Sequence, residues 1–206
     1  MEIVEELTKR KTERVRKMEY IDVCTEDGKP TGRVVERAAA HRDGTLHRTA
    51  HVWIVRRNGR GEPEILLQKR SRSKDSFPGY YDTSSAGHIP AGDEPLLSAV
   101  RELYEELGII AEPEQLKFAG TFRSQYEKVF YDRLFRDNEH TTVYVYDLPA
   151  DSFRLQESEV EEVRWFNLKE VYREIQTNRE RICVPKQGLD VLIDYIKKQN
   201  NIDIRE

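Results

Sequence analysis

One segment of the chain, residues 87–109 with the sequence GHIPAGDEPLLSAVRELYEELGI, limits the fold more than any other. Its second half predicts a helix with one buried face, because apolar residues recur every three or four positions. Asp93 is the expected N-cap, Pro95 suits the first helical turn, and Gly108 is the expected stop. The segment therefore predicts a glycine-containing loop that runs directly into a short helix. The apolar positions are Leu96, Val100, Leu103 and Leu107.

The same helix carries three carboxylates on one face, since Glu102 is three residues from Glu105 and four from Glu106. Like charges at these spacings repel by roughly a few tenths of a kcal/mol per pair, and Arg101 can pair with Glu105 one turn on. Hard cations such as Mg²⁺ bind carboxylate oxygens together with substrate phosphates. A loop that feeds a helix N-terminus is suited to hold an anion. The pattern favours a metal–phosphate site over the alternative, a solvated glutamate-rich surface.

This segment resembles the signature of the Nudix family of pyrophosphohydrolases, in which a glycine, an acid and an Arg-Glu-aliphatic-X-Glu-Glu-X-Gly run follow at fixed intervals. Asp93 stands where the family has Glu, with Glu94 beside it. The resemblance implies a Nudix-type α/β/α sandwich with a mixed β-sheet, in which the motif loop and helix form the catalytic surface. The matching positions are Gly87, Asp93, Arg101, Glu102, Leu103, Glu105, Glu106, Gly108 and Ile109.

Strand and helix patterns alternate along the rest of the chain, which predicts one core of the α/β or α+β class without internal repeats. Residues 1–18 are expected to form a charged helical arm, and residues 19–206 a single Nudix domain that ends in two helices. Strands are expected within 20–35 around a turn at Asp27-Gly28, at 51–57, 64–70, 115–127, 140–148 and 162–168, and helices at 168–178 and 188–199.

Composition excludes several classes of protein. The formal charge is −4, from 34 basic and 38 acidic residues, which argues against a general nucleic-acid-binding surface. No apolar run approaches the roughly 20 residues of a membrane span, and the charged N-terminal sequence lacks the apolar core of a secretory signal. Cys24 and Cys183 show no metal-ligand spacing, which indicates two reduced, inert thiols. We expect a cytoplasmic protein.

Residues 33–90 resemble one branch of the same superfamily, the type I isopentenyl diphosphate isomerases and their hydrolase relatives. The isomerases use a metal site of three histidines and two acids. The resemblance implies that His41, His47 and His88 match the histidines and that Asp137 and Glu139 match the acids. The spacing from His41 to His47 is one residue shorter than in the isomerases.

The residue before the Gly-His pair of the motif separates hydrolysis from isomerisation. In the isomerases this residue is Cys, and here it is Ala86. Isomerisation needs a proton donor and a proton acceptor, and alanine cannot transfer a proton, so hydrolysis is favoured. For the histidines, the alternative to a metal site is that His41, His47 and His51 are hydrogen-bonded residues of a loop and a strand.

The expected function is Mg²⁺-dependent hydrolysis of a diphosphate linkage in a nucleoside diphosphate linked to another moiety, with Mn²⁺ as an alternative ion. Glu102, Glu105 and Glu106 are the expected catalytic and metal-binding residues, with Gly87 as a further metal ligand. Glu102 is the first candidate for the general base, and Glu139 is an alternative. The acidic run Glu157, Glu159, Glu161 and Glu162 offers further candidates or is a solvated turn.

Cationic side chains suit phosphate oxygens. By position, Arg70, Arg72 and Lys74 are expected to bind the substrate, together with His88 in the motif loop. The expected partner is a small-molecule diphosphate, and a homodimer is a further hypothesis. Two other functions stay open. One is isomerisation of a prenyl diphosphate, and the other is a catalytically silent module that binds a nucleotide, against which the three retained glutamates argue.

Overall fold

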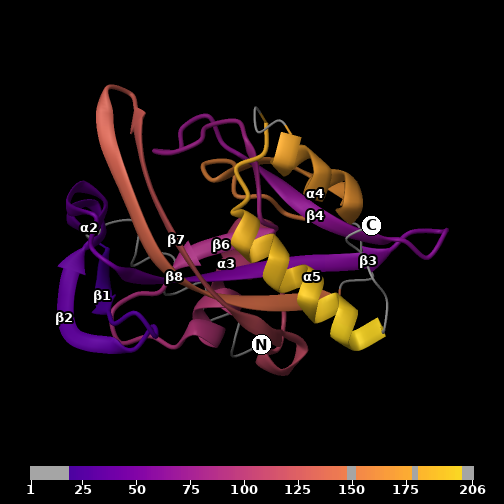
Figure 1. Ribbon diagram of the computed structural model, residues 1–206, viewed down its shortest axis with the longest axis horizontal. Helices are drawn as coiled ribbons and strands as arrows, with labels where there is room; N and C mark the ends of the chain where they lie inside the picture. The colour runs from indigo at the N-terminus through magenta and orange to yellow at the C-terminus, as the bar shows by residue number, and fades with distance from the viewer. Residues whose placement is uncertain (1–18, 148–151, 178–180, 201–206) are drawn as a thin grey trace.

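The computed structural model of the chain describes residues 19–147, 152–177 and 181–200 (Figure 1). The helical arm predicted at 1–18 lies outside these residues. The described residues form a nine-stranded mixed β-sheet and four α-helices, which confirms the predicted fold class. None of these helices is long and apolar enough to cross a membrane.

Strand β3 (His47–Arg57) is the centre of the sheet. It runs antiparallel to β4 (Pro63–Arg70) and β6 (Ser85–His88), and parallel to β8 (Arg133–Asp147). The strands predicted at 51–57 and 64–70 are therefore confirmed, and they pair as a hairpin, although β3 begins four residues before the expected start at His51. This position pairs β3 with the motif strand β6 along one edge and with β8 along the other.

The sheet is completed by shorter strands at its margins. β5 (Tyr81–Asp82) and β9 (Val160–Asn167) pair with β4. β1 (Tyr20–Cys24) and β2 (Pro30–Glu36) form the hairpin predicted around Gly28, whose φ of 79° suits a tight turn. After β2 the chain forms α2 (Arg37–Asp43), which the sequence did not predict. Seven residues are too few for a stable isolated helix, so tertiary contacts decide its formation.

The strands predicted at 115–127 and 140–148 are parts of one long hairpin. β7 (Lys117–Phe130) joins β8 through a turn at Tyr131 and Asp132, whose φ values are 50° and 60°. Two positive φ values are typical of a type I′ turn, which is usually marked by Asn-Gly or Asp-Gly. The absence of that signal hid the extension of the strands. The hairpin projects beyond the rest of the fold in Figure 1.

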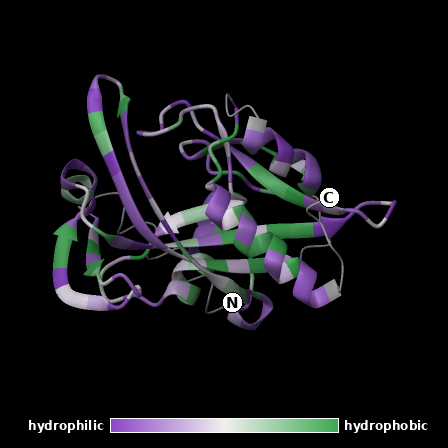
Figure 2. Ribbon diagram, in the orientation of Figure 1, coloured by the Kyte–Doolittle hydropathy of each residue, from purple (hydrophilic) through white to green (hydrophobic). Residues whose placement is uncertain are grey.

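The core lies on both faces of the sheet because side chains alternate along each strand. Val52, Ile54 and Leu66 pack under α3 (Pro95–Leu107) on one face. Trp53 and Leu67 pack on the other face, under α4 (Leu168–Thr177) and α5 (Lys186–Asn200). Hydrophobic residues accordingly follow β3 along much of its length (Figure 2). The two C-terminal helices confirm the predicted helical periodicity.

Helix α3 follows the prediction at its end but differs at its start. Gly108 adopts φ 70° and its N–H bonds to the Tyr104 carbonyl at 3.0 Å, as expected for a helix stop. The N-cap is Glu94 rather than Asp93, because Asp93 instead accepts a hydrogen bond from Arg101 at 3.4 Å. Glu102 and Glu106 are buried, as are Val100, Leu103 and Leu107 of the apolar stripe. The carboxylate face of the helix is therefore not a solvated surface.

Candidate active site

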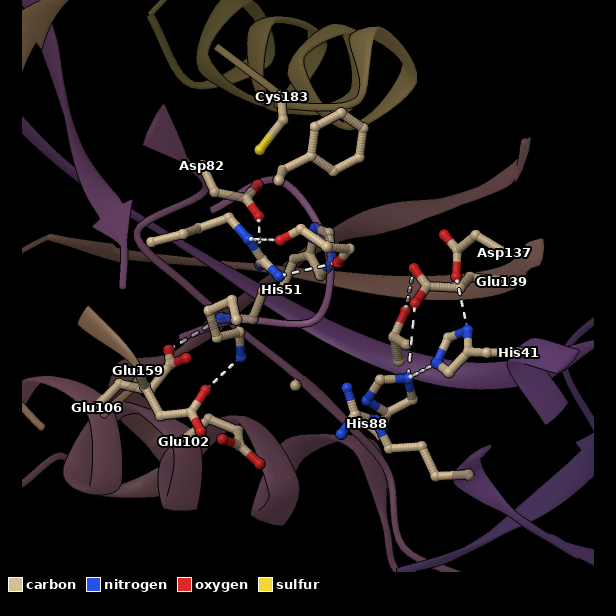
Figure 3. A pocket seen from close by; sticks show the side chains of 18 of the residues that line it. His41, His51, Asp82, His88, Glu102, Glu106, Asp137, Glu139, Glu159 and Cys183 are labelled. Carbon is tan, nitrogen blue, oxygen red and sulfur yellow. Dashed lines mark hydrogen bonds and ion pairs between the residues drawn. The ribbon is translucent and has the colours of Figure 1, made fainter. Parts of the chain in front are cut away.

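A cavity of about 360 Å³ lies where the motif loop, β3, β8 and the connection from β4 to β5 meet. Its lining contains eight carboxylates and three cationic side chains, so a bound cation would relieve a strongly negative interior. Figure 3 shows glutamates of α3 on one side, a cluster of histidines and acids on the other, and His51 between them in this view. The labelled groups on the two sides are Glu102, Glu106 and Glu159, and His41, His88, Asp137 and Glu139.

Gly87 makes room for the carboxylate of Glu102. A Cβ atom at Gly87 would lie 2.6 Å from Glu102 Cγ and 2.5 Å from its Oε1, well inside van der Waals contact. Arg101 fixes the same carboxylate, because its Nη2 donates to Glu102 Oε1 at 2.7 Å and to the His88 carbonyl at 3.3 Å. The space taken by Glu102 therefore explains why the motif has glycine at position 87. The predicted role of Gly87 as a metal ligand stays a prediction.

Glu106 is the most deeply held of the three motif glutamates. Its Oε2 accepts hydrogen bonds from Ser85 Oγ at 2.7 Å, Gln68 Nε2 at 3.2 Å and the Ala86 N–H at 3.2 Å. Burial raises the pKa of Glu106 to about 8, and the charge of Glu102 adds to the shift, although Ser85 acts against it. Carboxylates that resist ionising together are a donor set that a divalent cation stabilises, so these residues fit Mg²⁺.

The histidines and acids implied by the second resemblance also come together. His41 Nε2 and His88 Nε2 are 3.0 Å apart, and His41, His47 and His88 offer ligand atoms within 4.8 Å of one another. His47, Asp137 and Glu139 form a second such group. Parallel pairing of β3 with β8 places His47 opposite Glu139, which is why residues 92 positions apart meet. We call these five residues the histidine–acid cluster.

Hydrogen bonds and electrostatics prepare this cluster for a cation. His47 Nδ1 donates to the Thr45 carbonyl at 2.8 Å, which fixes the ring with Nε2 directed at the cluster, 3.8 Å from Glu139 Oε1. Burial lowers the pKa of His41 to about 4 and that of His88 well below its ordinary value, so both rings are neutral, as metal ligands must be.

The two acids of the cluster have pKa values that move in opposite directions. Burial, followed by the charge of Glu139, raises the pKa of Asp137 to about 9. Burial would also raise the pKa of Glu139, but hydrogen bonding and charge from His47 outweigh it and hold the pKa at about 2. The pair therefore shares one proton, which a bound cation would displace.

The predicted phosphate-binding residues are arranged unequally. Lys74 lines the cavity and forms an ion pair with Glu159. Arg70 lines it too, but its guanidinium donates to the Ser76 carbonyl at 2.9 Å, to Ser76 Oγ at 3.0 Å and to Asp82 at 3.0 Å. Its main role in the structure is to hold the loop 71–80.

Arg72 does not fit the predicted role. Its side chain is 82% exposed, lies 3.8 Å from Glu161 and is not part of the cavity lining. Position in the sequence alone could not separate it from its neighbours, because the turn after β4 sends adjacent side chains in different directions. Of the acidic run, Glu159 lines the cavity, whereas Glu161 pairs with Lys69 at 2.9 Å.

Several lining residues were missed by sequence reasoning. Arg37 lies at the start of the unpredicted helix α2 and pairs with Asp75 at 3.0 Å. Asp82 lines the cavity beside Arg70, and Cys183, a free thiol, comes from the segment before α5. Burial raises the pKa of the Cys183 thiol well above its usual range, which agrees with the expectation of an inert thiol.

Comparison with known proteins places the chain in a family. The NUDIX domain profile matches residues 45–186, which contain the motif, its helix and the strands around the cavity. The chain belongs to the Nudix family. Nudix enzymes generally use a divalent metal, in agreement with the donor sets described above.

Similar proteins place it more narrowly within the Nudix family. Nudix hydrolase 3 of Arabidopsis thaliana is 42% identical over 171 residues, which are 81% of this chain and 21% of that protein, so the chain spans about a fifth of that relative. An isopentenyl-diphosphate Delta-isomerase of Aliivibrio fischeri is 28% identical over 167 residues, covering 81% of this chain and 90% of the isomerase. This Nudix chain therefore lies in the isomerase-like branch, as predicted.

Solved structures confirm the Nudix fold independently: the crystal structure of a NUDIX hydrolase from Alicyclobacillus acidocaldarius superposes with a TM-score of 0.53 at 14% identity, covering 74% of this chain and 91% of that one. The crystal structure of DR0079 from Deinococcus radiodurans superposes with a TM-score of 0.60 at 18% identity, covering 84% of this chain and 98% of that one. At this identity the likeness shows the fold alone.

Proposed function

We propose that the protein is a Mg²⁺-dependent hydrolase of a diphosphate linkage in a nucleoside diphosphate linked to another moiety. The observation that carries this proposal is the convergence of Glu102, Glu105 and Glu106 on one side of a cavity whose lining has an excess of carboxylates. Membership of the Nudix family supports the reaction class. The nucleoside diphosphate nature of the substrate and the identity of the metal as Mg²⁺ are proposed beyond this reaction class.

The three glutamates would hold Mg²⁺, with Mn²⁺ as the alternative. When bound, the ion supplies charge neutralisation on the diphosphate and a lower pKa for the attacking water. Glu102 is the proposed general base, since Gly87 leaves its carboxylate space at the cavity wall. Glu106 stays fixed by Ser85 and the Ala86 N–H.

On the substrate side, Lys74 and Arg37 supply positive charge to the cavity, and His88 joins the lining from the motif loop. Arg70 keeps the loop that carries Lys74 in place. Phe77, Tyr126 and Phe135 give the cavity an aromatic wall that suits stacking with a base.

A second metal centre is proposed at the histidine–acid cluster, where three imidazoles and two carboxylates combine. This mixed set of nitrogen and oxygen ligands suits Mn²⁺, Zn²⁺ or a similar ion better than Mg²⁺. The assembled cluster also favours one alternative function, isomerisation of a prenyl diphosphate. Ala86 opposes it, because the side chain that faces His51 across β6 and β3 carries no transferable proton.

The test is phosphate release, with a coupled phosphatase and Mg²⁺, across nucleoside diphosphate derivatives and isopentenyl diphosphate. The double variant Glu105→Gln, Glu106→Gln should abolish turnover, whereas the exposed control Glu114→Gln should retain it. Turnover that survives the double variant would contradict the proposal. Double-bond migration in isopentenyl diphosphate without phosphate release would identify the isomerase instead.

A further inference from the structure

His51 is a cavity residue for which the function proposed above has no role. Only 7% of its surface is exposed, and it lines the cavity from the middle of β3. Within the described residues neither ring nitrogen makes a hydrogen bond, and Nδ1 is buried without a partner. The alternative to a metal site, a hydrogen-bonded strand histidine, therefore does not describe His51.

An unpartnered polar group inside a protein is unfavourable, by roughly 1–3 kcal/mol relative to a satisfied one. The histidines of the histidine–acid cluster each have one ring nitrogen with a partner: His41 meets His88, and His47 bonds to Thr45. His51 lies on the same face of β3 as His47 and Thr49, two residues beyond Thr49, and is outside the histidine–acid cluster. A bound ligand would supply the hydrogen-bond partner that the described residues do not give to His51.

The surroundings of His51 indicate which group this is. Antiparallel pairing of β3 and β6 sets His51 opposite Ala86, whose methyl group leaves space in front of the ring. Ala86 adjoins the Ser85–Glu106 contact on one side and His88 on the other. In Figure 3 His51 lies between the α3 carboxylates and the histidine–acid cluster, where a diphosphate that bridges both metal-binding sets would pass.

The three cationic side chains of the cavity lining each already contact an acidic residue, Arg37 through Nη2 to Asp75 at 3.0 Å. Arg70 commits its guanidinium to Ser76 and Asp82, and Lys74 is paired with Glu159. Burial lowers the pKa of His51, so the ring is neutral and carries one N–H to donate. A buried donor without a partner is the feature expected of a preorganised contact to an anionic oxygen.

We infer that His51 is a substrate-binding residue whose imidazole N–H donates a hydrogen bond to an oxygen of the diphosphate, in the space beside Ala86. The inference rests on the proposed function, because it takes a diphosphate as the occupant. It differs from a metal-ligand role, which would make His51 part of one of the two cation sites.

The test measures binding of imidodiphosphate, a diphosphate that is not hydrolysed, by titration calorimetry with saturating Mg²⁺. A hydrogen bond to a charged group corresponds to about 10- to 150-fold in affinity, so His51→Leu should weaken binding by that factor. His51→Asn or His51→Gln, which put an amide N–H near Nδ1 or Nε2, should restore most of it in one of the two variants. The matched control His140→Leu changes a histidine outside the cavity lining and should bind as the parent does.

Two results would overturn the inference. One is an imidodiphosphate affinity within threefold of the parent in His51→Leu, and the other is a loss of Mn²⁺ affinity measured without any diphosphate, which would make His51 a metal ligand. If the leucine variant does not fold, His51→Val, which suits a strand, takes its place. Because binding needs no turnover, failure of the hydrolysis panel leaves this test intact, and turnover with unchanged imidodiphosphate affinity removes only the role of His51.

Discussion

Replacement of Gly87 by alanine tests whether the position of Glu102 controls activity. The new Cβ would lie 2.6 Å from Glu102 Cγ and 2.5 Å from Oε1, whereas carbon atoms in contact are about 3.5–4.0 Å apart. Glu102 must therefore move by about 1 Å or more. A displacement of that size at a catalytic group lowers activity by roughly 100-fold, which corresponds to about 2.7 kcal/mol of activation free energy.

The same substitution should leave folding almost intact. The atoms that the Cβ meets belong to the end of a flexible side chain, and Gly87 does not need a positive φ. We expect the free energy of unfolding to change by less than about 1.5 kcal/mol. Activity loss without unfolding would separate the role of this glycine from a general role in stability.

The assay compares kcat/KM for the best substrate of the panel, together with urea unfolding, in Gly87→Ala and in the control Gly59→Ala. An alanine Cβ at Gly59 meets no atom within 4 Å, so the control should match the parent in both measurements. The reasoning is refuted if Gly87→Ala keeps kcat/KM within threefold of the parent, since the position of Glu102 would then not matter for catalysis.

Three further predictions concern the charged groups of the cavity. Burial raises the pKa of Glu106 from 4.5 to about 8. Between these pH values the folded protein without metal keeps a proton on Glu106 that the unfolded chain has lost. The stability contributed by this proton is complete below about pH 4.5 and is lost as pH rises through 8. Urea unfolding in EDTA should therefore show the parent losing stability relative to Glu106→Gln across this window, and parallel pH profiles of the two proteins would contradict the raised pKa. Arg70→Lys should lower the free energy of unfolding by about 2 kcal/mol and raise KM, because contacts to Ser76 and Asp82 are lost and the loop bearing Lys74 loosens. Arg72→Lys, at an exposed position, is the control. Equal unfolding free energies and KM values in the two variants would mean that Arg70 does not hold the loop. The double variant His47→Ala, His88→Ala should bind one Mn²⁺ fewer per chain by native mass spectrometry while Glu105→Gln, Glu106→Gln retains that ion, and an unchanged ratio in the histidine variant would argue against the second metal centre.

The sequence determined the parts of this protein that depend on local spacing. The helix of residues 95–107 follows from an apolar repeat every three or four residues, and its end follows from a glycine that adopts φ 70° without strain. The α3 carboxylates share a face for the same reason. The family resemblance rests on these spacings, and so the family could be recognised from the chain alone.

Tertiary structure decided what depends on contacts between distant segments. Parallel pairing of β3 with β8 brings Glu139 to His47, and pairing of β3 with β6 sets His51 opposite Ala86. No local pattern encodes such pairings, because the register of a sheet is fixed by which faces are buried. The sequence offered the histidine–acid cluster only through resemblance, and the structure shows that its members meet.

Side-chain direction is the second property that only the tertiary structure settled. Arg70 and Arg72 look equivalent in the sequence, yet one is committed to Ser76 and Asp82 and the other points to solvent. His51 resembles an ordinary strand histidine until its burial and its lack of a partner are known. Spacing along a chain fixes which residues share a face of one element, whereas the partners of a side chain depend on the elements packed against it, and these are set by the fold as a whole.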